Sequence, residues 1–335
     1  MEYRTLGRSG LKVSPLCLGT MLFGGATDEA AAQEIVAEAA AVGVNFIDTA
    51  DGYTGGRSEE VVGRAIRASR DEWVLATKFG NARGPGANVG GTSRKWVMQA
   101  CENSLKRLGT DYIDLYYLHK EDHSVPLAET VRALADLQRQ GKIRYFGVSN
   151  YRSWRVAEIC RIADELNIDR PAASQPYYNL VNRMPETEQL PACGYFGLGV
   201  FPYSPIARGV LSGKYAPGST PVEGSRAARG DKRILETEWR DESLVVAQKM
   251  KARAESAGVT PGQFATAWVL NNALITGVVA GPRTLAQWRD YVGALDYRFT
   301  AEDEAFCDEL VVTGHPSTPG YNDPQYPIEG RVSRA

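Results

Sequence analysis

The chain of 335 residues carries 38 Lys and Arg against 40 Asp and Glu, which gives a formal net charge of −2 at pH 7. This balance excludes a general electrostatic attraction to nucleic acid or to an anionic membrane, so phosphate recognition would require a local basic cluster. We expect a small-molecule partner, with neither nucleic acid nor membrane as a partner. A barrel of alternating strands and helices routinely has about 250 residues or more as one domain, and we expect a single domain over residues 1–335.

The N-terminal segment and the cysteines indicate a cytoplasmic protein. The sequence MEYRTLGRSG has neither a basic start nor an apolar core of the kind found in secretory signals, and no run of about 18 apolar residues occurs anywhere. An odd number of cysteines without a C-x-x-C pair argues against a disulfide framework. We therefore expect reduced thiols at Cys17, Cys101, Cys160, Cys193 and Cys307.

Short apolar runs rich in β-forming residues recur along the chain and alternate with segments of helical period. The first helical segment begins at Thr27, has acidic residues in its first turn and ends at Gly43, and a later one covers residues 127–142 and ends at Gly141. Strands that are apolar on both faces and are joined by helices indicate a parallel sheet covered on both sides, and eight such units fit a closed (β/α)8 TIM barrel. The predicted strands are residues 15–21, 44–50, 73–79, 112–119, 143–150, 172–179, 199–206 and 275–281.

An open, doubly wound sheet is the alternative fold for this pattern. Its dinucleotide-binding form requires the glycine fingerprint G-x-G-x-x-G directly after the first strand. The sequence GTMLFGG stands at residues 19–25 instead. The barrel is therefore favoured.

Three segments are longer than a minimal barrel requires. They are a flexible loop at 81–91 after the third strand, an insertion at 207–242 after the seventh strand, and a tail rich in Pro and Tyr at 314–331. Long irregular segments in compact domains are usually functional, and barrel enzymes build their active sites at the C-terminal ends of the strands. We expect these three segments to surround the active site.

Ionisable residues stand at the ends of three consecutive predicted strands. Asp48 ends the second, Lys78 the third and His119 the fourth, while Tyr53 lies in the loop after the second. Each residue alone has an ordinary structural explanation, but placing an ionisable group at the end of an apolar strand costs free energy. Three such residues together therefore indicate a functional site. A lysine cation can stabilise a phenolate, a carboxylate can hold the lysine charged, and a histidine can position a substrate oxygen.

Other chemistries are less well supported by the sequence. No Ser or Cys stands with an acid and base at a spacing that indicates an activated nucleophile. His119 and His123 have the i, i+4 spacing of a zinc pair, but the first ends a strand and Pro126 follows soon after, so no helix presents both on one face. The third histidine, His315, lies in the tail. We expect no metal.

The chain resembles the aldo-keto reductases over nearly its whole length. The matching segments are YRTLGRSGLKVSPLCLGTMLFG, NFIDTADGYTGGRSEEVVGRAI, VLATKFG, DYIDLYYLHKED and GKIRYFGVSNY, in the family's order. The resemblance implies a (β/α)8 barrel with an N-terminal β-hairpin and a C-terminal tail over its mouth, which binds NADPH without a Rossmann domain. It also implies a catalytic tetrad of Asp48, Tyr53, Lys78 and His119, in which the tyrosine donates a proton while hydride passes from the nicotinamide to a carbonyl carbon.

The resemblance also assigns cofactor contacts segment by segment. Ser149, Asn150 and Gln175 match the residues that hold the nicotinamide carboxamide, Tyr203 matches the aromatic residue that stacks on the ring, and Arg283 matches a residue that can pair with the 2′-phosphate. The family pattern is not kept at Asp290 and Tyr291, where Glu and Asn are common. The full implied set is Gly19, Thr20, Met21, Asp48, Ser149, Asn150, Gln175, Tyr203, Ser204, Ile206, Gly209, Leu211, Lys214, Gly281, Arg283 and Gln287.

The substrate is less determined than the reaction. Met21, Phe23, Tyr53 and His119, with Tyr321 and Tyr326 of the tail, predict an aromatic and apolar pocket. Such a pocket favours a hydrophobic or cyclic carbonyl, such as a terpenoid, a steroid, a mycotoxin or a sugar-derived ketone. Two alternatives stay open, namely a cofactor-binding regulatory subunit of the channel-associated type and an alcohol dehydrogenase that works in the oxidative direction. The sequence leaves the oligomeric state open.

Overall fold

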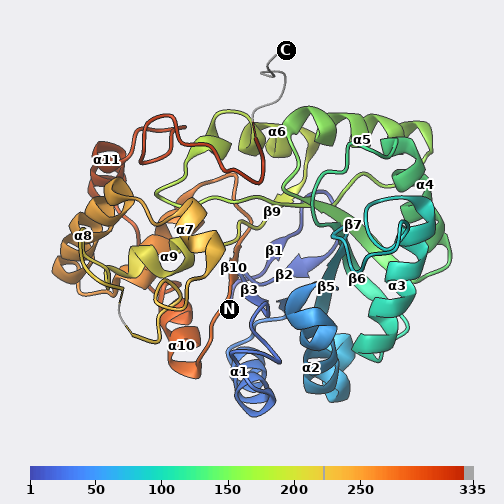
Figure 1. The fold of residues 1–335 in the computed structure, drawn as a ribbon, viewed down its shortest axis with the longest axis horizontal. Coiled ribbons are helices and arrows are strands. Elements are labelled where there is room, and N and C mark those ends of the chain that lie inside the picture. The colour runs from blue at the N-terminus through green and yellow to red at the C-terminus, as the bar shows by residue number, and fades with distance from the viewer. Residues whose placement is uncertain (222, 328–335) are drawn as a thin grey trace.

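Eight parallel strands form the centre of the molecule, and helices surround them (Figure 1). The structure is a computed structural model that describes residues 1–221 and 223–327. The strands follow the order β10-β3-β4-β5-β6-β7-β8-β9, so consecutive strands pair from β3 to β9, and β10 pairs with β3. Their bounds are β3 (Leu16–Gly19), β4 (Phe46–Asp48), β5 (Val74–Phe79), β6 (Ile113–Leu118), β7 (Ile143–Ser149), β8 (Ala173–Gln175), β9 (Gly199–Val200) and β10 (Val278–Ala280).

The sheet closes into a barrel between its first and last strands. Tyr203 and Val279 form a parallel bridge, and the Val279 amide donates to Pro202 O at 2.9 Å, while the Thr276 amide donates to Val200 O at 2.9 Å. All eight predicted strands are confirmed, and so is the (β/α)8 barrel. The regular strands are shorter than the apolar runs, because prolines interrupt them: Pro176 follows β8 directly and Pro202 follows β9 closely, and proline has no amide hydrogen for the ladder.

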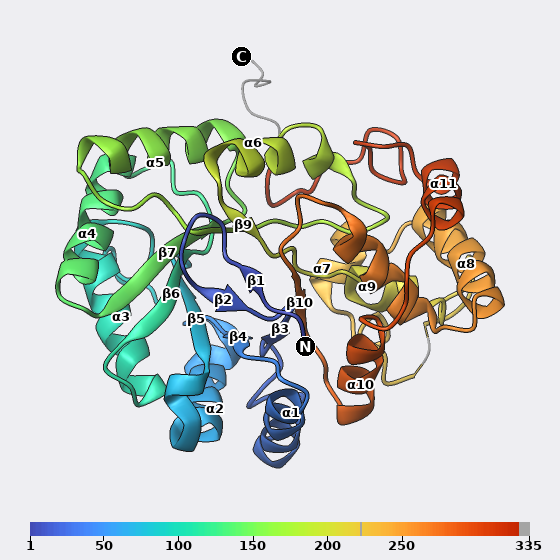
Figure 2. The ribbon, with the colours of Figure 1, turned by 180° about the vertical axis from the view of Figure 1, so that it is seen from behind.

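A short hairpin precedes the barrel and covers one of its ends (Figure 2). It consists of β1 (Arg4–Thr5) and β2 (Lys12–Val13), which pair antiparallel. Leu6 and Val13 are fully buried and pack with side chains that fill the barrel interior. The hairpin predicted from the family resemblance is therefore present, and it closes the end of the barrel opposite the C-terminal ends of the strands.

Helices follow the strands and form the outer layer. Asp28, and not Thr27, caps the first helix: its side chain accepts from the Ala31 amide at 2.9 Å, while the Thr27 hydroxyl donates to Arg283 O at 3.0 Å. The predicted start at Thr27 is thus one residue early. The bounds are α1 (Glu29–Ala41), α2 (Arg57–Ile66), α3 (Arg94–Leu108), α4 (Leu127–Arg139), α5 (Ser153–Glu165), α6 (Gln189–Phe196), α7 (Lys232–Thr237), α8 (Asp241–Ser256), α9 (Pro261–Asn271), α10 (Leu285–Gly293) and α11 (Ala301–Leu310), with 3₁₀ turns η1 (Tyr53–Gly56), η2 (Arg67–Glu72), η3 (Met184–Glu186) and η4 (Ala207–Ser212).

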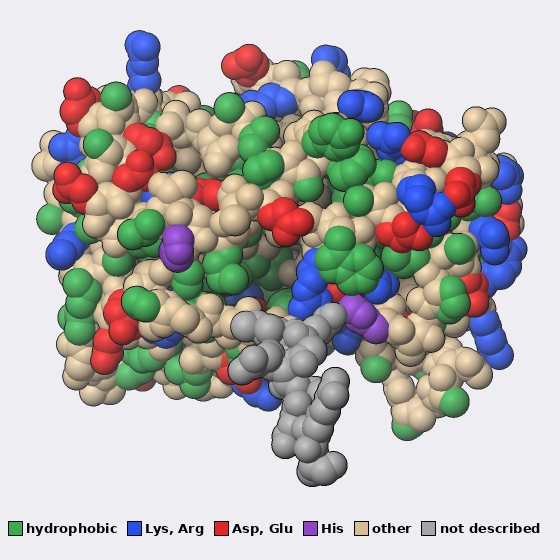
Figure 3. Space-filling model, turned by 90° about the horizontal axis from the view of Figure 1, so that it is seen from above, with side chains coloured by type: hydrophobic (Ala, Val, Ile, Leu, Met, Phe, Trp, Pro, Cys, Tyr) green, Lys and Arg blue, Asp and Glu red, His purple; other side chains and the backbone are tan. Residues whose placement is uncertain are grey.

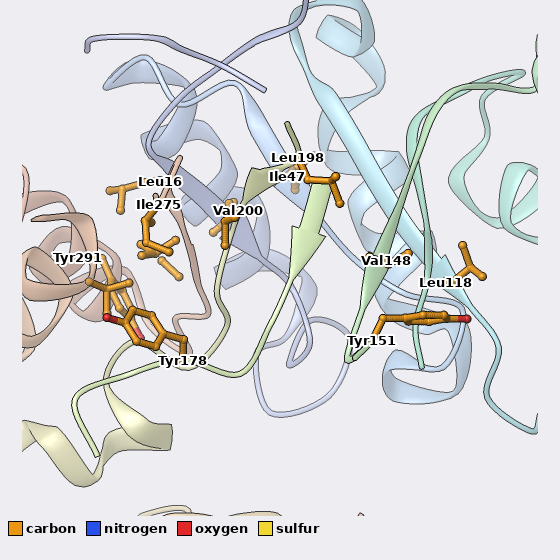
Figure 4. Packing of buried hydrophobic residues seen from close by; sticks show 14 of the residues in the cluster. Leu16, Ile47, Leu118, Val148, Tyr151, Tyr178, Leu198, Val200, Ile275 and Tyr291 are labelled. Atoms are coloured by element: carbon orange, nitrogen blue, oxygen red, sulfur yellow. The ribbon is translucent and has the colours of Figure 1, made fainter. Parts of the chain in front are cut away.

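The core has two layers, as expected for strands that are buried on both faces. Outward-facing strand residues such as Leu16, Ile47 and Leu118 pack against the helices, and Figure 4 shows part of this layer. Inward-facing residues such as Phe46 and Tyr117 fill the barrel itself. The Phe46 ring meets the Phe201 ring edge-on, with 4.9 Å between centroids. The interior of the barrel is thus a packed core of side chains.

The three long segments lie at that mouth. The loop at 81–91 contains no regular element, whereas the insertion at 207–242 contains η4 and α7. Arg233 of the insertion binds Asp323 of the tail through two hydrogen bonds of 3.0 and 2.6 Å. Residues 328–331 of the predicted tail lie outside the described residues. In the part of the chain that the structure describes, none of the helices has the length and apolar character of a membrane span.

The face shown in Figure 3 has acidic and basic side chains interspersed around scattered hydrophobic ones. This mixture agrees with the small net charge of the sequence.

Candidate active site

The barrel brings the four predicted reactive residues together. Asp48 ends β4, Lys78 lies near the end of β5, His119 follows β6 directly, and Tyr53 begins η1. Parallel strands place their C-terminal ends at the same rim, and residues at alternate positions point into the barrel. The side chains therefore converge at the mouth, as the sequence predicts.

Lys78 is the centre of this group and is fully buried. Its ammonium forms an ion pair with Asp48 Oδ1 and donates to Thr49 O at 2.9 Å and to the Tyr53 hydroxyl at 3.2 Å. These three bonds use all three hydrogens of the ammonium. Burial alone would lower the pKa of Lys78, but the Asp48 charge and these hydrogen bonds raise it above its ordinary value. Lys78 is a fixed cation beside the phenol.

Asp48 holds Lys78 from the barrel side and also contacts the sixth barrel strand, β8. Its second oxygen, Oδ2, accepts from Gln175 Nε2 at 3.1 Å. Burial raises the pKa of the Asp48 carboxyl, while the Lys78 ammonium and the Gln175 amide both oppose that rise. The carboxylate thus connects the Lys78 ammonium with a side chain that the sequence assigns to the nicotinamide site.

Tyr53 is brought to the mouth by an unusual turn. Thr54, Gly55 and Gly56 all have positive φ, at 49°, 71° and 104°, which turns the chain from β4 back into α2. Burial raises the pKa of Tyr53, and the Lys78 ammonium opposes this rise without reversing it. The phenol is therefore protonated at neutral pH and can give a proton, while Lys78 lies ready to stabilise the phenolate.

His119 completes the group with a neutral ring. Its ring edge faces the Tyr53 ring, with centroids 5.8 Å apart and planes at 81°. Burial, followed by the positive charges of Lys78 and Lys120, lowers its pKa to about 3. Nδ1 of the ring lies 3.0 Å from Nδ2 of Asn81, a residue that the sequence analysis places only within the loop at 81–91.

A second polar cluster adjoins the four residues. Asn150 has a φ of 57° and donates from Nδ2 to His119 O at 2.9 Å, while its Oδ1 accepts from the Tyr203 hydroxyl at 2.8 Å. The Ser149 hydroxyl donates to Gln175 O at 2.8 Å. The Tyr203 ring stacks on Tyr177 at 5.6 Å between centroids. The residues assigned to the nicotinamide by resemblance are thus held together beside Tyr53 and His119.

A cavity of about 710 Å³ runs from Tyr53 and His119 towards the start of α10. Nearly all of the predicted contacts line it, and Lys78 lies just beneath its floor. The lining includes Gly19, Thr20, Met21, Asp48, Tyr53, His119, Ser149, Asn150, Gln175, Tyr203, Ser204, Ile206, Gly209, Lys214, Gly281, Arg283, Gln287 and Tyr326.

Three predicted residues do not reach the cavity. Phe23 is fully buried in the outer core layer, because its amide donates to Thr20 O at 2.9 Å and the resulting turn directs the ring inward. Leu211 is also fully buried in that layer. Tyr321 donates to Glu236 O at 3.4 Å and lies under the Arg240 guanidinium. The assignments of Phe23 and Tyr321 to the substrate pocket are therefore corrected, whereas the cofactor contact expected of Leu211 is one of its backbone and stays a prediction.

The far end of the cavity is rich in cations that the sequence analysis missed. Arg226 and Arg229 of the insertion line it together with Lys214 and Arg283. Both Arg229 and Arg283 donate to Gly224 O, at 3.1 and 3.2 Å, so the insertion is tied to the segment before α10. Arg226 lies 3.6 Å from an Asp231 carboxylate oxygen, whereas Lys214, Arg229 and Arg283 form no ion pair with a carboxylate among the described residues, and such a set suits phosphate groups. The cavity thus fits an extended dinucleotide with its phosphates at this end.

Backbone strain concentrates beside the same cavity. Six non-glycine residues in the described part of the chain have positive φ, and all but Asn167 lie at this site. Strained backbone of this kind persists where the surrounding structure enforces it, and it clusters at functional sites. The five residues are Thr54, Asn150, Ser204, Ala207 and Arg208.

Asp51 is a buried acid next to Tyr53 that the sequence analysis did not single out. Its carboxylate is 2% exposed, and within the described residues neither oxygen has a hydrogen-bond partner. Burial, followed by the charge of Glu59, raises the pKa of Asp51 to about 7, although Arg83, Arg107 and Lys78 oppose the rise. The segment that follows β4 therefore contains a buried acid whose pKa is raised to about 7.

The remaining histidines do not join the site. His123 contacts Glu121 at 3.0 Å, and His315 contacts Thr313 O at 3.0 Å. Over residues 1–221 and 223–327, no group of three or more His, Cys, Asp or Glu side chains is arranged to hold a metal ion.

Comparison with known proteins identifies the family. Residues 15–312 match the model of the aldo/keto reductase family. A probable voltage-gated potassium channel subunit beta of Arabidopsis thaliana is 38% identical over 301 residues, which cover 88% of this chain and 92% of that protein. An uncharacterized oxidoreductase of Bacillus subtilis, YrpG, is 35% identical over 314 residues, which cover 90% and 93%. The chain therefore belongs to the aldo/keto reductase family of oxidoreductases.

Proposed function

We propose that the protein reduces aldehydes or ketones with NADPH and that Tyr53 donates the proton. The observation that carries this proposal is the contact of the protonated Tyr53 phenol with the Lys78 ammonium, at 3.2 Å, beside the neutral His119 ring. This arrangement lies at one end of the cavity, and the cations lie at the other.

The roles of the four residues follow from their contacts. NADPH, when bound, supplies the reducing equivalents that the carbonyl carbon accepts. The Tyr53 hydroxyl gives its proton to the carbonyl oxygen, and Lys78 stabilises the phenolate that forms. Asp48 keeps Lys78 charged and in place. The His119 ring, which is neutral, can donate one hydrogen bond to the same oxygen and orient it.

The cations at the far end support NADPH over NADH. Arg283, with Arg226 and Arg229 nearby, can bind the 2′-phosphate, since a guanidinium pairs with phosphate through two hydrogen bonds. We expect Arg283→Ala to raise the Kd for NADPH about 10- to 100-fold, as expected for loss of a hydrogen bond to a charged group, and to change the Kd for NADH little. Fluorescence titration measures both constants. Equal effects on the two cofactors would contradict the assignment of Arg283.

The substrate end of the cavity supports a hydrophobic or cyclic carbonyl. Met21, Leu22, Tyr203 and Tyr326 give it apolar and aromatic surface, and the Met21 side chain is 38% exposed. Polar side chains in the cavity lining include Asn81, Lys120 and Gln325. Such a lining suits a terpenoid, a steroid, a mycotoxin or a sugar-derived ketone in which an apolar ring carries the carbonyl.

The direct test is the loss of NADPH absorbance in the presence of carbonyls that range from small aldehydes to bulky cyclic ketones. We expect turnover that favours the cyclic ketones, and a decrease of about 10³-fold or more in Tyr53→Phe with an unchanged Kd for NADPH. Turnover that survives in Tyr53→Phe would remove the tyrosine from its role. Equal efficiency towards glyceraldehyde and bulky ketones would contradict the substrate class.

A second candidate function is that of a regulatory subunit that binds the cofactor. It is favoured by the names of the plant relatives, which include a probable voltage-gated potassium channel subunit beta of Oryza sativa subsp. japonica, 37% identical over 302 residues. This function predicts tight NADPH binding, negligible turnover with every carbonyl and a stable symmetric oligomer. Light scattering coupled to size-exclusion chromatography, run beside the turnover assay, separates the two functions.

The proposal also covers the direction of the reaction and the cellular location of the protein. Oxidation of alcohols with NADP⁺ in the same assay tests whether the protein works as an alcohol dehydrogenase. All five cysteines are free and buried, which supports work in the reducing cytoplasm.

A further inference from the structure

We propose that Asn81 is a positioning residue that fixes His119 as the tautomer with its proton on Nε2. The inference rests on the proposed reduction, because it states which ring nitrogen can donate to the carbonyl oxygen. It is carried by one contact, the 3.0 Å separation of Asn81 Nδ2 and His119 Nδ1.

The donor in this contact is Asn81. An amide nitrogen carries two hydrogens and no free lone pair, so it can only donate, and Nδ1 of His119 must accept. A neutral imidazole has one donor nitrogen and one acceptor nitrogen. If Nδ1 accepts, the proton resides on Nε2. The opposite tautomer would present a lone pair to the carbonyl oxygen of a substrate and would repel it.

The surroundings of His119 leave this choice to Asn81. The ring is partly buried in the cavity wall, and this burial, followed by the positive charges of Lys78 and Lys120, lowers its pKa and keeps it neutral. Tyr53 meets the ring edge-on, and Asn150 binds the backbone oxygen of His119 instead of its ring. Among the described residues, Asn81 is the one side chain with a hydrogen bond to a ring nitrogen of His119.

The backbone conformation at Gly80 places Asn81 beside the His119 ring. Gly80, between the end of β5 and Asn81, has a φ of 120°, which side chains on an L-residue rarely permit. The His119 amide donates to Phe79 O at 2.8 Å, so the two strands are still paired at the point where the chain turns. Asn81 therefore folds back over the end of β6, half-buried in the cavity wall.

The first test reads the tautomer directly and needs no turnover. The protein has three histidines, so ¹⁵N-histidine labelling with long-range ¹H–¹⁵N NMR gives three patterns, and His123→Gln and His315→Gln assign two of them. We expect a neutral His119 with a protonated Nε2 throughout pH 5–8. A His119 that carries its proton on Nδ1 in the wild-type protein would overturn the proposal.

Variants of Asn81 make the test specific. In Asn81→Asp the carboxylate can only accept, so we expect the proton to move to Nδ1 and the imidazole pKa to rise. In Asn81→Ala we expect a mixture of tautomers. Asn88→Ala, an exposed asparagine of the same loop, is the matched control and should leave His119 unchanged. An unchanged Nε2–H tautomer in both Asn81 variants would overturn the proposal.

Kinetics separates this inference from the proposed function. We expect Asn81→Ala and Asn81→Asp to lower kcat about 10²-fold, the size of a lost donor to the reacting oxygen, with little change in the Kd for NADPH. Asn81→Asp should also gain an ionisation in its pH profile, because a charged imidazole restores an Nε2 donor at lower pH. Failure of the wild-type protein to reduce any carbonyl would refute the proposed function and leave the NMR result as the test of the tautomer.

Discussion

Asp51 makes the stability of the protein depend on pH in a direction opposite to that of most carboxylates. Its pKa is about 7 in the folded protein against an ordinary value of 3.8, because the carboxyl is buried near Glu59. The folded state therefore binds this proton more tightly than the unfolded chain does. The resulting stability is fully present below about pH 4 and is lost as the pH rises through about 7.

The magnitude follows from the gap between the two pKa values. At about 1.4 kcal/mol for each pH unit, ionisation of Asp51 destabilises the folded state by on the order of 4 kcal/mol above pH 8. Asp51→Asn keeps the shape of the side chain and removes the ionisation. For 335 residues the entropy of unfolding is about 0.7 kcal/mol/K, so we expect the variant to melt about 6 °C above wild type at pH 8 and about 2 °C above it at pH 5.

The assay is thermal unfolding of both proteins at pH 5, 6, 7 and 8, because only the difference between them reports on Asp51. Asp111→Asn, an exposed aspartate, is the matched control and should show no such trend. A difference in Tm between Asp51→Asn and wild type that stays constant from pH 5 to pH 8 would refute this reasoning, and so would a difference that shrinks as the pH rises.

Three further substitutions test the site and the core. Lys78→Met leaves Asp48 buried without its cation, so we expect turnover to be lost. Urea unfolding should show a free energy of unfolding about 3–5 kcal/mol lower at pH 8, and part of it should be regained at pH 5. An equal loss of stability at pH 5 and pH 8 would contradict the ion pair. Phe23→Ala should cost about 3–5 kcal/mol without reordering the preferred carbonyls, whereas a new ranking would return Phe23 to the pocket. Burial alone would raise the pKa of Asp303, but hydrogen bonds from the Thr300 amide and the Arg253 guanidinium outweigh this effect and lower it. We therefore expect Asp303→Asn to lower the free energy of unfolding by about 2–3 kcal/mol at pH 7 and by less as the pH falls below 4. A loss of stability that does not depend on pH would exclude this charge effect.

The barrel and its four central residues could be predicted because both depend on local patterns. Alternation along a strand decides which residues face inward, and the last inward-facing residue of a strand points into the mouth. Asp48, Lys78 and His119 all follow this rule. The rule says nothing about residues that follow the strand, and Phe23 shows the result: a hydrogen bond three residues back turns its ring into the core.

The cations of the insertion could not be predicted, since their positions depend on contacts between distant parts of the chain. Arg283 meets the carbonyl of Gly224, 59 residues earlier, and Arg233 meets Asp323, 90 residues later. Segments of this kind have no period from which a facing side could be inferred. Asn81 was missed for a related reason, because one glycine with positive φ determines where its side chain points.

The closing seam of the barrel has a consequence for solubility. A long free edge of a sheet presents unpaired backbone N–H and C=O groups that can pair with another chain, and natural proteins prevent this with short edge strands or by covering the edge. The two strands that meet at the seam, β9 and β10, have only two and three residues. If the seam opened, it would offer little regular edge to a second molecule. The short strands at the seam therefore limit aggregation if the barrel opens there.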